Sequence, residues 1–107
     1  MPLLTFIVNC PDAASADKIA SDLVSRGLVA CANFHPPVRS LYHWKGQLQS
    51  VEEIPLVLKT RPDLRNEVES EIARLHPYEV PPILRLTLDA NTSYLGWVNA
   101  ETGSPSI

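Results

Sequence analysis

The sequence predicts one small α+β domain in which strands and helices follow the order β-α-β-β-α-β, with a further helix at the C-terminus. Three features carry this prediction: two apolar helical stripes, apolar strands before the first helix and after the second, and a long extended region between the helices. The chain has 107 residues, of which 45% are hydrophobic. This length and composition suit a single core, so we expect residues 1–107 to form one domain.

The first strand and helix are predicted near the N-terminus. Leu3–Asn9 is apolar enough for a strand covered on both faces, and hence for a central place in a sheet. Pro11 and Asp12 then favour a helix start, because proline fits a first turn and an acid suits the positive end of the helix dipole. Gly27 ends this helix. Its apolar residues recur at helical spacing: Ala16, Ile19, Ala20, Leu23 and Val24.

A long β-hairpin is predicted next. The chain is extended from Leu28 to Trp44, with an interruption at Pro36-Pro37, and again from Gln47 to Lys59. Lys45-Gly46 between these arms forms a two-residue turn. If no bulge intervenes, the turn sets three cross-strand pairs: Trp44 with Gln47, Tyr42 with Gln49, and Arg39 with Glu52.

The length of this hairpin indicates an oligomer. Each arm has roughly 13 to 17 residues and would span about 45–55 Å, whereas a domain of this size is about 35 Å across. We therefore expect the hairpin to overhang its own domain and to pair with a neighbouring copy, which would cover its unpaired edges and its apolar tip. In the alternative, Pro36-Pro37 and Pro55 cut the arms into short strands within one copy.

The second half of the chain repeats the helix and strand pattern. Residues 60–63 favour a helix start, and His76-Pro77 ends that helix. Ile83–Leu88 alternates as a strand, and Asn91-Thr92-Ser93 caps a short final helix. Residues from about 102 to 107 are predicted to be a flexible tail. Both main helices would cover one face of an antiparallel sheet, which is the ferredoxin-like arrangement.

Composition and charge argue against several classes of function. The net charge is −3 with both signs scattered, so no basic patch indicates a nucleic-acid partner. The N-terminal apolar run lacks the basic flank of a signal peptide, and no run approaches the ~20 apolar residues that cross a membrane. Cys10 and Cys31 do not have metal-motif spacing. Without a secretion signal, we expect reduced thiols and a cytoplasmic location.

No catalytic motif occurs, so we expect no enzyme activity and name no catalytic residue. The strongest candidate segment is His76-Pro77-Tyr78-Glu79-Val80-Pro81, in which a histidine, a phenol and a carboxylate are held between prolines. Such a rigid polar loop suits a binding site. His76 could equally cap the C-terminus of its helix. From the residues alone, both interpretations stand.

Other polar and aromatic residues have simple structural explanations. Cys31 fits a small buried residue better than a ligand, and Cys10 fits a structural thiol beside a helix N-terminus. Lys59 ends an apolar strand, so its charge would emerge at a sheet end or at an interface. Tyr42 and Trp44 fit packing better than stacking on a ligand.

Six motifs follow one another along the chain. They are Asn9-Cys10-Pro11-Asp12, Leu28-Val29-Ala30-Cys31-Ala32-Asn33, Val38-Arg39-Ser40-Leu41-Tyr42-His43-Trp44-Lys45-Gly46, Glu52-Glu53 through Leu58-Lys59-Thr60, His76-Pro77-Tyr78-Glu79-Val80-Pro81, and Tyr94-Leu95-Gly96-Trp97. In this order and at this spacing, the chain resembles the CutA family of divalent-cation tolerance proteins over nearly its whole length.

The resemblance implies a ferredoxin-like fold and a homotrimer built through the long hairpin, similar to PII signalling proteins. It also implies a role in tolerance to, or binding of, divalent metals, copper (Cu²⁺) above all, with no organic cofactor. By matching positions, the metal ligands would be His76, Cys31 and Glu79. The rest of a cleft between subunits would be lined by Arg39, Lys59, Tyr78, Tyr42 and Trp44.

The chain departs from the family pattern at two positions, Pro55 and Pro82, and a third position, Val8, is one where family members differ. Pro55 stands where the family usually has an aliphatic residue, and it removes a hydrogen-bond donor from a strand, so we expect a bulge or an edge there. Pro82 stands where the family usually has glutamate, which removes one possible carboxylate ligand. Val8 is apolar in the first strand, where members differ in the placing of cysteine.

Three functions remain as hypotheses. The first is a copper-binding homotrimer that uses His76, with Cys31 and Glu79, because imidazole and thiolate suit Cu²⁺. The second is a PII-like small-ligand sensor in which Lys59 and Arg39 receive an anion at the subunit cleft. The third is a structural trimeric assembly module without a ligand.

Overall fold

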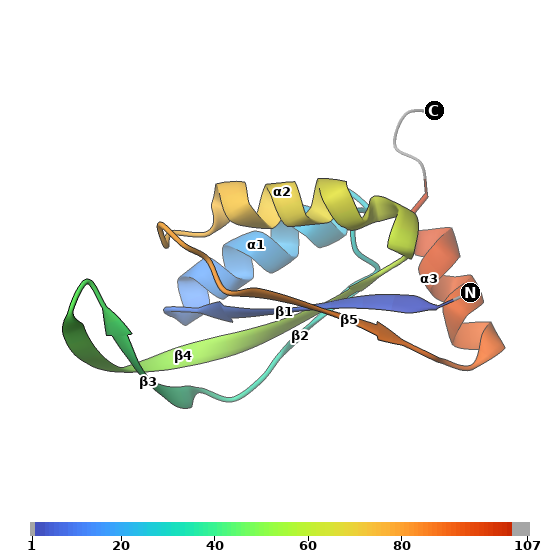
Figure 1. Ribbon diagram of the computed structural model, residues 1–107. Helices are drawn as coiled ribbons and strands as arrows, with labels where there is room; N and C mark the ends of the chain where they lie inside the picture. Colours follow the sequence, from blue (N-terminus) through green and yellow to red (C-terminus); the bar gives the residue numbers. More distant parts are fainter. Residues whose placement is uncertain (1, 104–107) are drawn as a thin grey trace.

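The computed structural model describes residues 2–103, which form one layer of strands and one layer of helices (Figure 1). The strands are β1 (Leu3–Cys10), β2 (Cys31–Phe34), β3 (Val38–Trp44), β4 (Gln47–Thr60) and β5 (Ile83–Leu88). The helices are α1 (Ala13–Ser25), α2 (Arg65–Leu75), which follows a short 3-10 turn at Pro62–Leu64, and α3 (Thr92–Glu101). None of the helices in this part of the chain is long and apolar enough to cross a membrane.

The predicted ferredoxin-like α+β fold is confirmed. The sheet has the order β2-β4-β1-β5, every neighbouring pair is antiparallel, and β3 also pairs with β4. β1 lies between β4 and β5, as its apolar sequence predicts. Figure 1 shows α1 and α2 side by side on one face of the sheet. The additional helix α3 lies at the end of the sheet where β1 begins.

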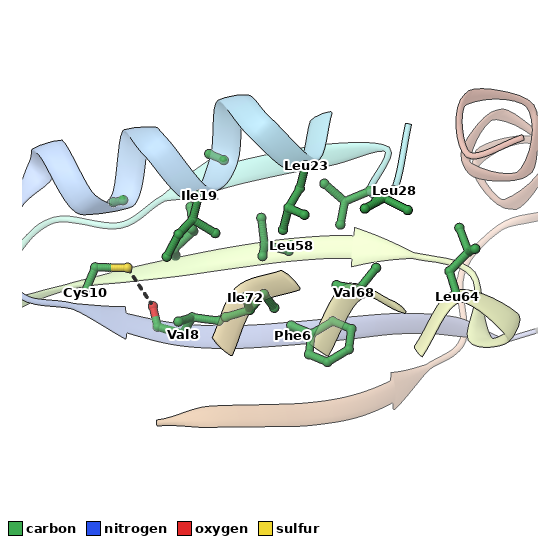
Figure 2. Close-up of a cluster of buried hydrophobic side chains, with 14 of the residues drawn as sticks. Phe6, Val8, Cys10, Ile19, Leu23, Leu28, Leu58, Leu64, Val68 and Ile72 are labelled. Carbon is green, nitrogen blue, oxygen red and sulfur yellow. Dashed lines mark hydrogen bonds between the residues drawn. The ribbon is translucent and has the colours of Figure 1, made fainter. Parts of the chain in front are cut away.

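The hydrophobic core lies between the sheet and these two helices (Figure 2). Alternate residues of β1 point into it, and Phe6 and Val8 are fully buried. They pair with Leu58 and Leu56 of β4, so all four side chains share the helix-covered face. The helices contribute apolar residues at helical spacing, among them Ile19, Leu23, Val68 and Ile72.

The start and end of α1 follow from local chemistry. Asp12 is the N-cap rather than a first-turn residue: its carboxylate accepts a hydrogen bond from the backbone N–H of Ser15 at 2.8 Å. The hydrogen bonds with Ser15 lower the pKa of Asp12. At the other end, Gly27 has a φ of +70°, which a residue without a Cβ adopts at little cost, and α1 ends there as predicted.

The hairpin register is confirmed in full. Trp44 stands opposite Gln47, Tyr42 opposite Gln49, and Arg39 opposite Glu52. The turn residues Lys45 and Gly46 have φ angles of 50° and 80°. Positive φ at both positions is the type I′ turn, whose twist matches that of the two strands.

Pro55 lies where β4 exchanges one partner strand for another. β2 pairs as far as Phe34 opposite Leu56, and β3 pairs from Val38 opposite Glu53. Residues 35–37 therefore stand opposite only two residues of β4, Ile54 and Pro55. This extra residue makes the bulge-like break that was expected at Pro55. The Pro55 carbonyl accepts a hydrogen bond from the N–H of His35 at 3.0 Å. In an antiparallel strand, the nitrogen and the carbonyl of one residue point to the same edge. The nitrogen of Pro55 therefore faces the break between β2 and β3, as its carbonyl does. The N–H that proline lacks would not have bonded to β1, so the pairing of β4 with β1 loses no hydrogen bond.

The two expectations for the hairpin arms each hold in part. Pro36-Pro37 divides the first arm into β2 and β3, whereas the second arm runs through Pro55 as one strand of 14 residues. The described residues extend 45 × 27 × 20 Å. Figure 1 shows the β3–β4 hairpin projecting at one end of the long axis, beyond the helices.

The face of the sheet opposite α1 and α2 is apolar and largely uncovered. Ile7 of β1 pairs with Val57 of β4 and with Leu84 of β5, so all three point to this face. Leu84, Leu86 and Leu88 are 62%, 45% and 43% exposed. We call Ile7, Val57, Leu84, Leu86 and Leu88 the open face. α3 covers only its far end, through a small cluster of Leu3, Ala30 and Val98 with Tyr94 and Leu95.

The expected C-terminal tail is folded at its beginning. α3 extends to Glu101, and Thr102 is fully buried with its hydroxyl donating to the Val98 carbonyl at 2.6 Å. Thr102 therefore belongs to the packed domain. Residues 104–107 of the expected tail lie outside the described residues.

A buried hydrogen bond ties β4 to the segment after α1, and its loss is measurable. The fully buried Thr60 hydroxyl donates to the Leu28 carbonyl at 2.7 Å. Thr60→Val keeps the volume but leaves that carbonyl unpaired, so we expect a loss of about 1–3 kcal/mol in the free energy of unfolding. Urea denaturation at matched protein concentration measures it. Thr87→Val on exposed β5 is the control and should stay within about 0.5 kcal/mol; equal losses would contradict the assignment.

Candidate functional site

A cavity of about 540 Å³ lies between the β3–β4 hairpin and residues 76–82, which join α2 to β5 and which we call the linker. We call it the hairpin cavity. It is lined by Asn9, Tyr42, Trp44, Gln49, Glu53, Pro77, Tyr78, Glu79, Val80 and Pro82. Three of these are aromatic, two are carboxylates and none is Lys, Arg or His. The linker prolines fix this wall because their φ angles are restricted.

Glu53 and Tyr78 form the polar centre of the hairpin cavity. Glu53 is only 4% exposed, and its carboxylate accepts a hydrogen bond from the Tyr78 hydroxyl at 2.8 Å. Burial, and then the Glu53 carboxylate, raise the pKa of Tyr78 above its ordinary value. The phenol therefore stays neutral and remains a donor at physiological pH.

His76 links three segments through its ring. It follows α2 as its C-cap, with its backbone N–H bonded to the Ile72 carbonyl at 2.9 Å. Its Nε2 lies 2.8 Å from the Asn9 carbonyl oxygen, and its Nδ1 accepts the Tyr78 backbone N–H at 3.1 Å. A carbonyl only accepts and an N–H only donates, so these partners require the neutral ring with its proton on Nε2.

His76 therefore occupies the C-cap position of α2 through its backbone, while its side chain bonds elsewhere. The side chain does not cap its own helix, because it bonds to the end of β1 and to the linker. Within one copy, only 6% of the His76 surface is accessible. A metal ion could bind His76 only after one of these two hydrogen bonds is released. His76 forms part of the support behind Tyr78 and so behind the hairpin cavity.

Glu79 lies at the rim of the same cavity. Its carboxylate is 3.4 Å from the Lys45 ammonium at the hairpin turn, and the two side chains are 69% and 68% exposed. An ion pair this exposed contributes little to stability. The Lys45 ammonium also lies 5.5 Å from the centre of the Trp44 ring.

Cys31 and Lys59 lie at the opposite end of the sheet. They stand opposite each other, and Lys59 also pairs with Thr5 of β1. His76 contacts Asn9, four residues further along β1, which is roughly 13 Å away. Within one copy, the structure therefore does not bring Cys31 and Lys59 together with His76.

Tyr94 is a further polar residue at that end, and the sequence indicated it as part of the Tyr94-Leu95-Gly96-Trp97 motif but not as a site residue. Its hydroxyl lies 3.4 Å from the half-buried Cys31 sulfur, and the Lys59 ammonium is 6.0 Å from its ring centre. Burial, and then the Cys31 thiol, raise the pKa of Tyr94 to about 12. Arg39 joins neither group, because its Nε donates to Ser50 Oγ across the hairpin at 3.0 Å.

The family model described as "CutA1 divalent ion tolerance protein" matches residues 4–101. This chain belongs to that family. A divalent-cation tolerance protein CutA from Pyrococcus horikoshii is 42% identical over 93 residues, which cover 86% of this chain and 90% of that one. A CutA homolog from Xenopus laevis is 39% identical over 92 residues, which cover 85% of this chain and 61% of that longer protein.

Solved structures agree with this assignment. The crystal structure of CutA1 from Pyrococcus horikoshii matches with a TM-score of 0.89 at 37% identity, covering 94% of this chain and 99% of that one. CutA1 from Ehrlichia chaffeensis matches with a TM-score of 0.90 at 29% identity, covering 95% and 96%. One neighbour, CutA from Archaeoglobus fulgidus, is described as periplasmic; it matches at 25% identity with a TM-score of 0.89, covering 94% and 99%.

Within residues 2–103 of this CutA1-family chain, no three His, Cys, Asp or Glu side chains lie close enough together to hold a metal ion. The predicted ligands His76, Cys31 and Glu79 are accordingly dispersed.

Sequence reasoning missed Glu53, the buried carboxylate of this family member. A signal was present: Glu52 and Glu53 are adjacent in a predicted strand, where successive side chains point to opposite faces. One of the two therefore had to point toward the domain. The partner that makes its burial possible, Tyr78, is distant in sequence and could not be assigned.

Replacing His76 should destabilise this CutA1-family protein. His76→Ala removes the partners of the Asn9 carbonyl and the Tyr78 N–H, so we expect a loss of about 2–4 kcal/mol in the free energy of unfolding. His43→Ala, at an exposed position in β3, is the control and should cost less than about 0.5 kcal/mol. Chemical denaturation of the two variants measures the difference. A loss for His76→Ala no larger than for the control would show that the ring is not a structural link.

Proposed function

We propose that this chain acts as a homotrimeric divalent-metal-binding protein, with copper as its metal, and that it is not an enzyme. The observation that carries the proposal is the open face. Exposed leucines of β5 and the partly covered Ile7 and Val57 form a continuous apolar surface on a domain whose other face is already packed. Apolar surface of this kind favours association. Three copies is the number that the resemblance to the CutA family implies.

The projecting hairpin supports the same assembly. At its tip, Leu41 and Leu48 are 61% and 63% exposed, and Tyr42 and Trp44 are 36% and 39% exposed. A two-stranded ribbon that projects from its domain is only marginally stable alone. A neighbouring copy would cover these side chains and the free edge of β3.

Metal binding is proposed at the boundary between copies. Membership of a divalent ion tolerance family supports a role for divalent metals. The proposed ligands Cys31 and Glu79 lie at opposite ends of one copy, so neighbouring copies would have to bring their ends together. Imidazole and thiolate suit copper, and the general order of affinities among divalent ions favours Cu²⁺. His76 would have to release its hydrogen bond to Asn9 or to Tyr78 before it could bind the metal ion. We therefore propose that it binds the ion after Cys31 and Glu79.

The hairpin cavity favours a second candidate function, a PII-like small-ligand sensor. A cavity of about 540 Å³ is within the size range of small-ligand sites. Arg39 and Lys59, the expected anion ligands, do not line it within one copy. An anion site would therefore require a neighbouring subunit. A cytoplasmic location remains part of the proposal, and both cysteines are free thiols.

The open face can be tested through the oligomeric state. We expect the wild-type protein to have the mass of a trimer in multi-angle light scattering, and Leu84→Glu with Leu86→Glu to give monomer or aggregate. Val24→Glu is the control, because Val24 is apolar and 41% exposed but lies on α1, away from the open face. A monomeric wild type would contradict the proposal. So would a result in which Val24→Glu loses assembly while Leu84→Glu with Leu86→Glu keeps it.

Copper binding can be tested by calorimetry on the folded oligomer. Cys31→Ser should weaken Cu²⁺ binding about tenfold, which is about 1.4 kcal/mol. Cys10→Ala is the matched control: Cys10 is fully buried, and burial raises the pKa of its thiol to about 11, so it should not bind metal. Equal affinity in wild type and Cys31→Ser would reject Cys31 as a ligand.

A further inference from the structure

We propose that the hairpin cavity binds a small organic cation, with an alkylammonium group held among the rings of Tyr42, Trp44 and Tyr78 and facing the carboxylate of Glu53. This inference deepens the small-ligand function proposed for the hairpin cavity and rests on it, and it does not depend on metal binding. It concerns a cavity that the described residues of one copy already form.

The first argument is that the buried Glu53 side chain has no cationic partner among the described residues of one copy. A carboxylate that is 4% exposed is ordinarily paired with a cation. Among the ion pairs of residues 2–103, none includes Glu53, and its hydrogen bond comes from a neutral phenol. Within one copy, the described residues that line this cavity include no Lys, Arg or His, and the nearest ammonium named above is that of Lys45 at the rim. A cation entering the cavity would supply the missing partner.

The second argument is the aromatic wall. Ammonium groups bind over the faces of Trp and Tyr rings within about 6 Å of their centres, and the attraction increases when water is excluded. Tyr42 and Trp44 come from β3, on the same side of the hairpin, while Tyr78 comes from the linker. Their positions bring aromatic surface into the cavity from two sides. The Tyr78 ring is uncharged at neutral pH, and its hydroxyl donates to Glu53 at 2.8 Å.

The third argument is that the protein already makes this contact at the cavity rim. The Lys45 ammonium lies 5.5 Å from the Trp44 ring centre and 3.4 Å from the Glu79 carboxylate. Ring, carboxylate and ammonium are thus combined within one chain. The Lys45 side chain is 68% exposed, so it is free to move away when a ligand ammonium enters deeper, toward Glu53.

Other ligand classes fit the cavity less well. An inorganic anion would meet two carboxylates, and within residues 2–103 of one copy the only ammonium named at the cavity, that of Lys45 at the rim, is already paired with Glu79. A divalent metal would find no group of three His, Cys, Asp or Glu donors among the described residues. Lining residues that are mainly aromatic, proline or valine favour a ligand with an apolar surface around its charge.

The probes are tetramethylammonium chloride and n-butylammonium chloride, titrated into the full-length protein in the oligomeric state that it adopts. Sodium chloride keeps the ionic strength constant. Calorimetry should show saturable binding with a Kd of about 1 mM, since so few atoms contribute. In a Trp97→Phe background, Trp44 is the remaining one of two tryptophans, so its fluorescence should change with the same Kd.

Two variants test the named groups. Glu53→Gln keeps an acceptor for Tyr78 but removes the charge, and Trp44→Leu removes a ring that is 39% exposed. Each should weaken binding about tenfold. Glu52→Gln is the matched control: it removes the adjacent carboxylate, which is exposed and points to the other side of β4, and affinity should not change.

The proposal would be overturned if the wild type showed no saturable binding of the ammonium probes. It would also be overturned if Glu53→Gln bound them as tightly as the wild type, or if Glu52→Gln weakened binding as much as Glu53→Gln does. If Glu53→Gln fails to fold, Trp44→Leu alone decides: unchanged affinity rejects the aromatic site, and a tenfold loss supports it. Binding of sodium phosphate in place of the ammonium probes would also contradict the assignment.

Discussion

Strand β4 pairs with three other strands, and most features of this domain depend on its continuity. One edge of β4 hydrogen-bonds to β1, and the other first to β3 and then to β2. Leu56 and Leu58 place its second half in the core, while its first half projects in the hairpin. This continuity is possible at Pro55 because its missing N–H faces the break between β2 and β3. The same strand carries Glu53 into the hairpin cavity.

The wall of that cavity is fixed by contacts between segments distant in sequence. His76 bonds to the last turn of α2 through its backbone and to β1 and the linker through its ring. This arrangement holds Tyr78 where its hydroxyl reaches Glu53. A histidine that would be taken for a metal ligand from its motif thus acts first as a positioning residue. Polar groups that satisfy one another in this way rigidify a site.

The two faces of the sheet have different roles. The face under α1 and α2 buries the apolar residues that stabilise a single copy. The open face carries comparable apolar side chains without a covering layer, and the hairpin adds exposed leucines at one end. A domain of this size buries a limited share of its surface, so association is an effective way to gain stability. The proposed assembly would also bring the Cys31 end of one copy toward another copy.

The sequence by itself determined the elements whose signals are local. Helical spacing gave α1 and α2, alternation gave the strands, and Lys45-Gly46 fixed the hairpin register residue by residue. The irregularity at Pro55 followed from the chemistry of proline alone. Six motifs were sufficient to indicate the family. These features depend on residues a few positions apart, where geometry is restricted by the backbone.

Only the tertiary structure decided what the polar residues do. His76 contacts Asn9 and Tyr78 contacts Glu53 across long stretches of chain, and no periodicity encodes such pairs. The separation of Cys31 from His76 follows from the strand register between β1, β2 and β4, which joins three distant segments. Whether a side chain is a ligand, a support or a solvated charge depends on burial and on its partners. Those are properties of the packed domain, because they arise where segments meet rather than within any one of them.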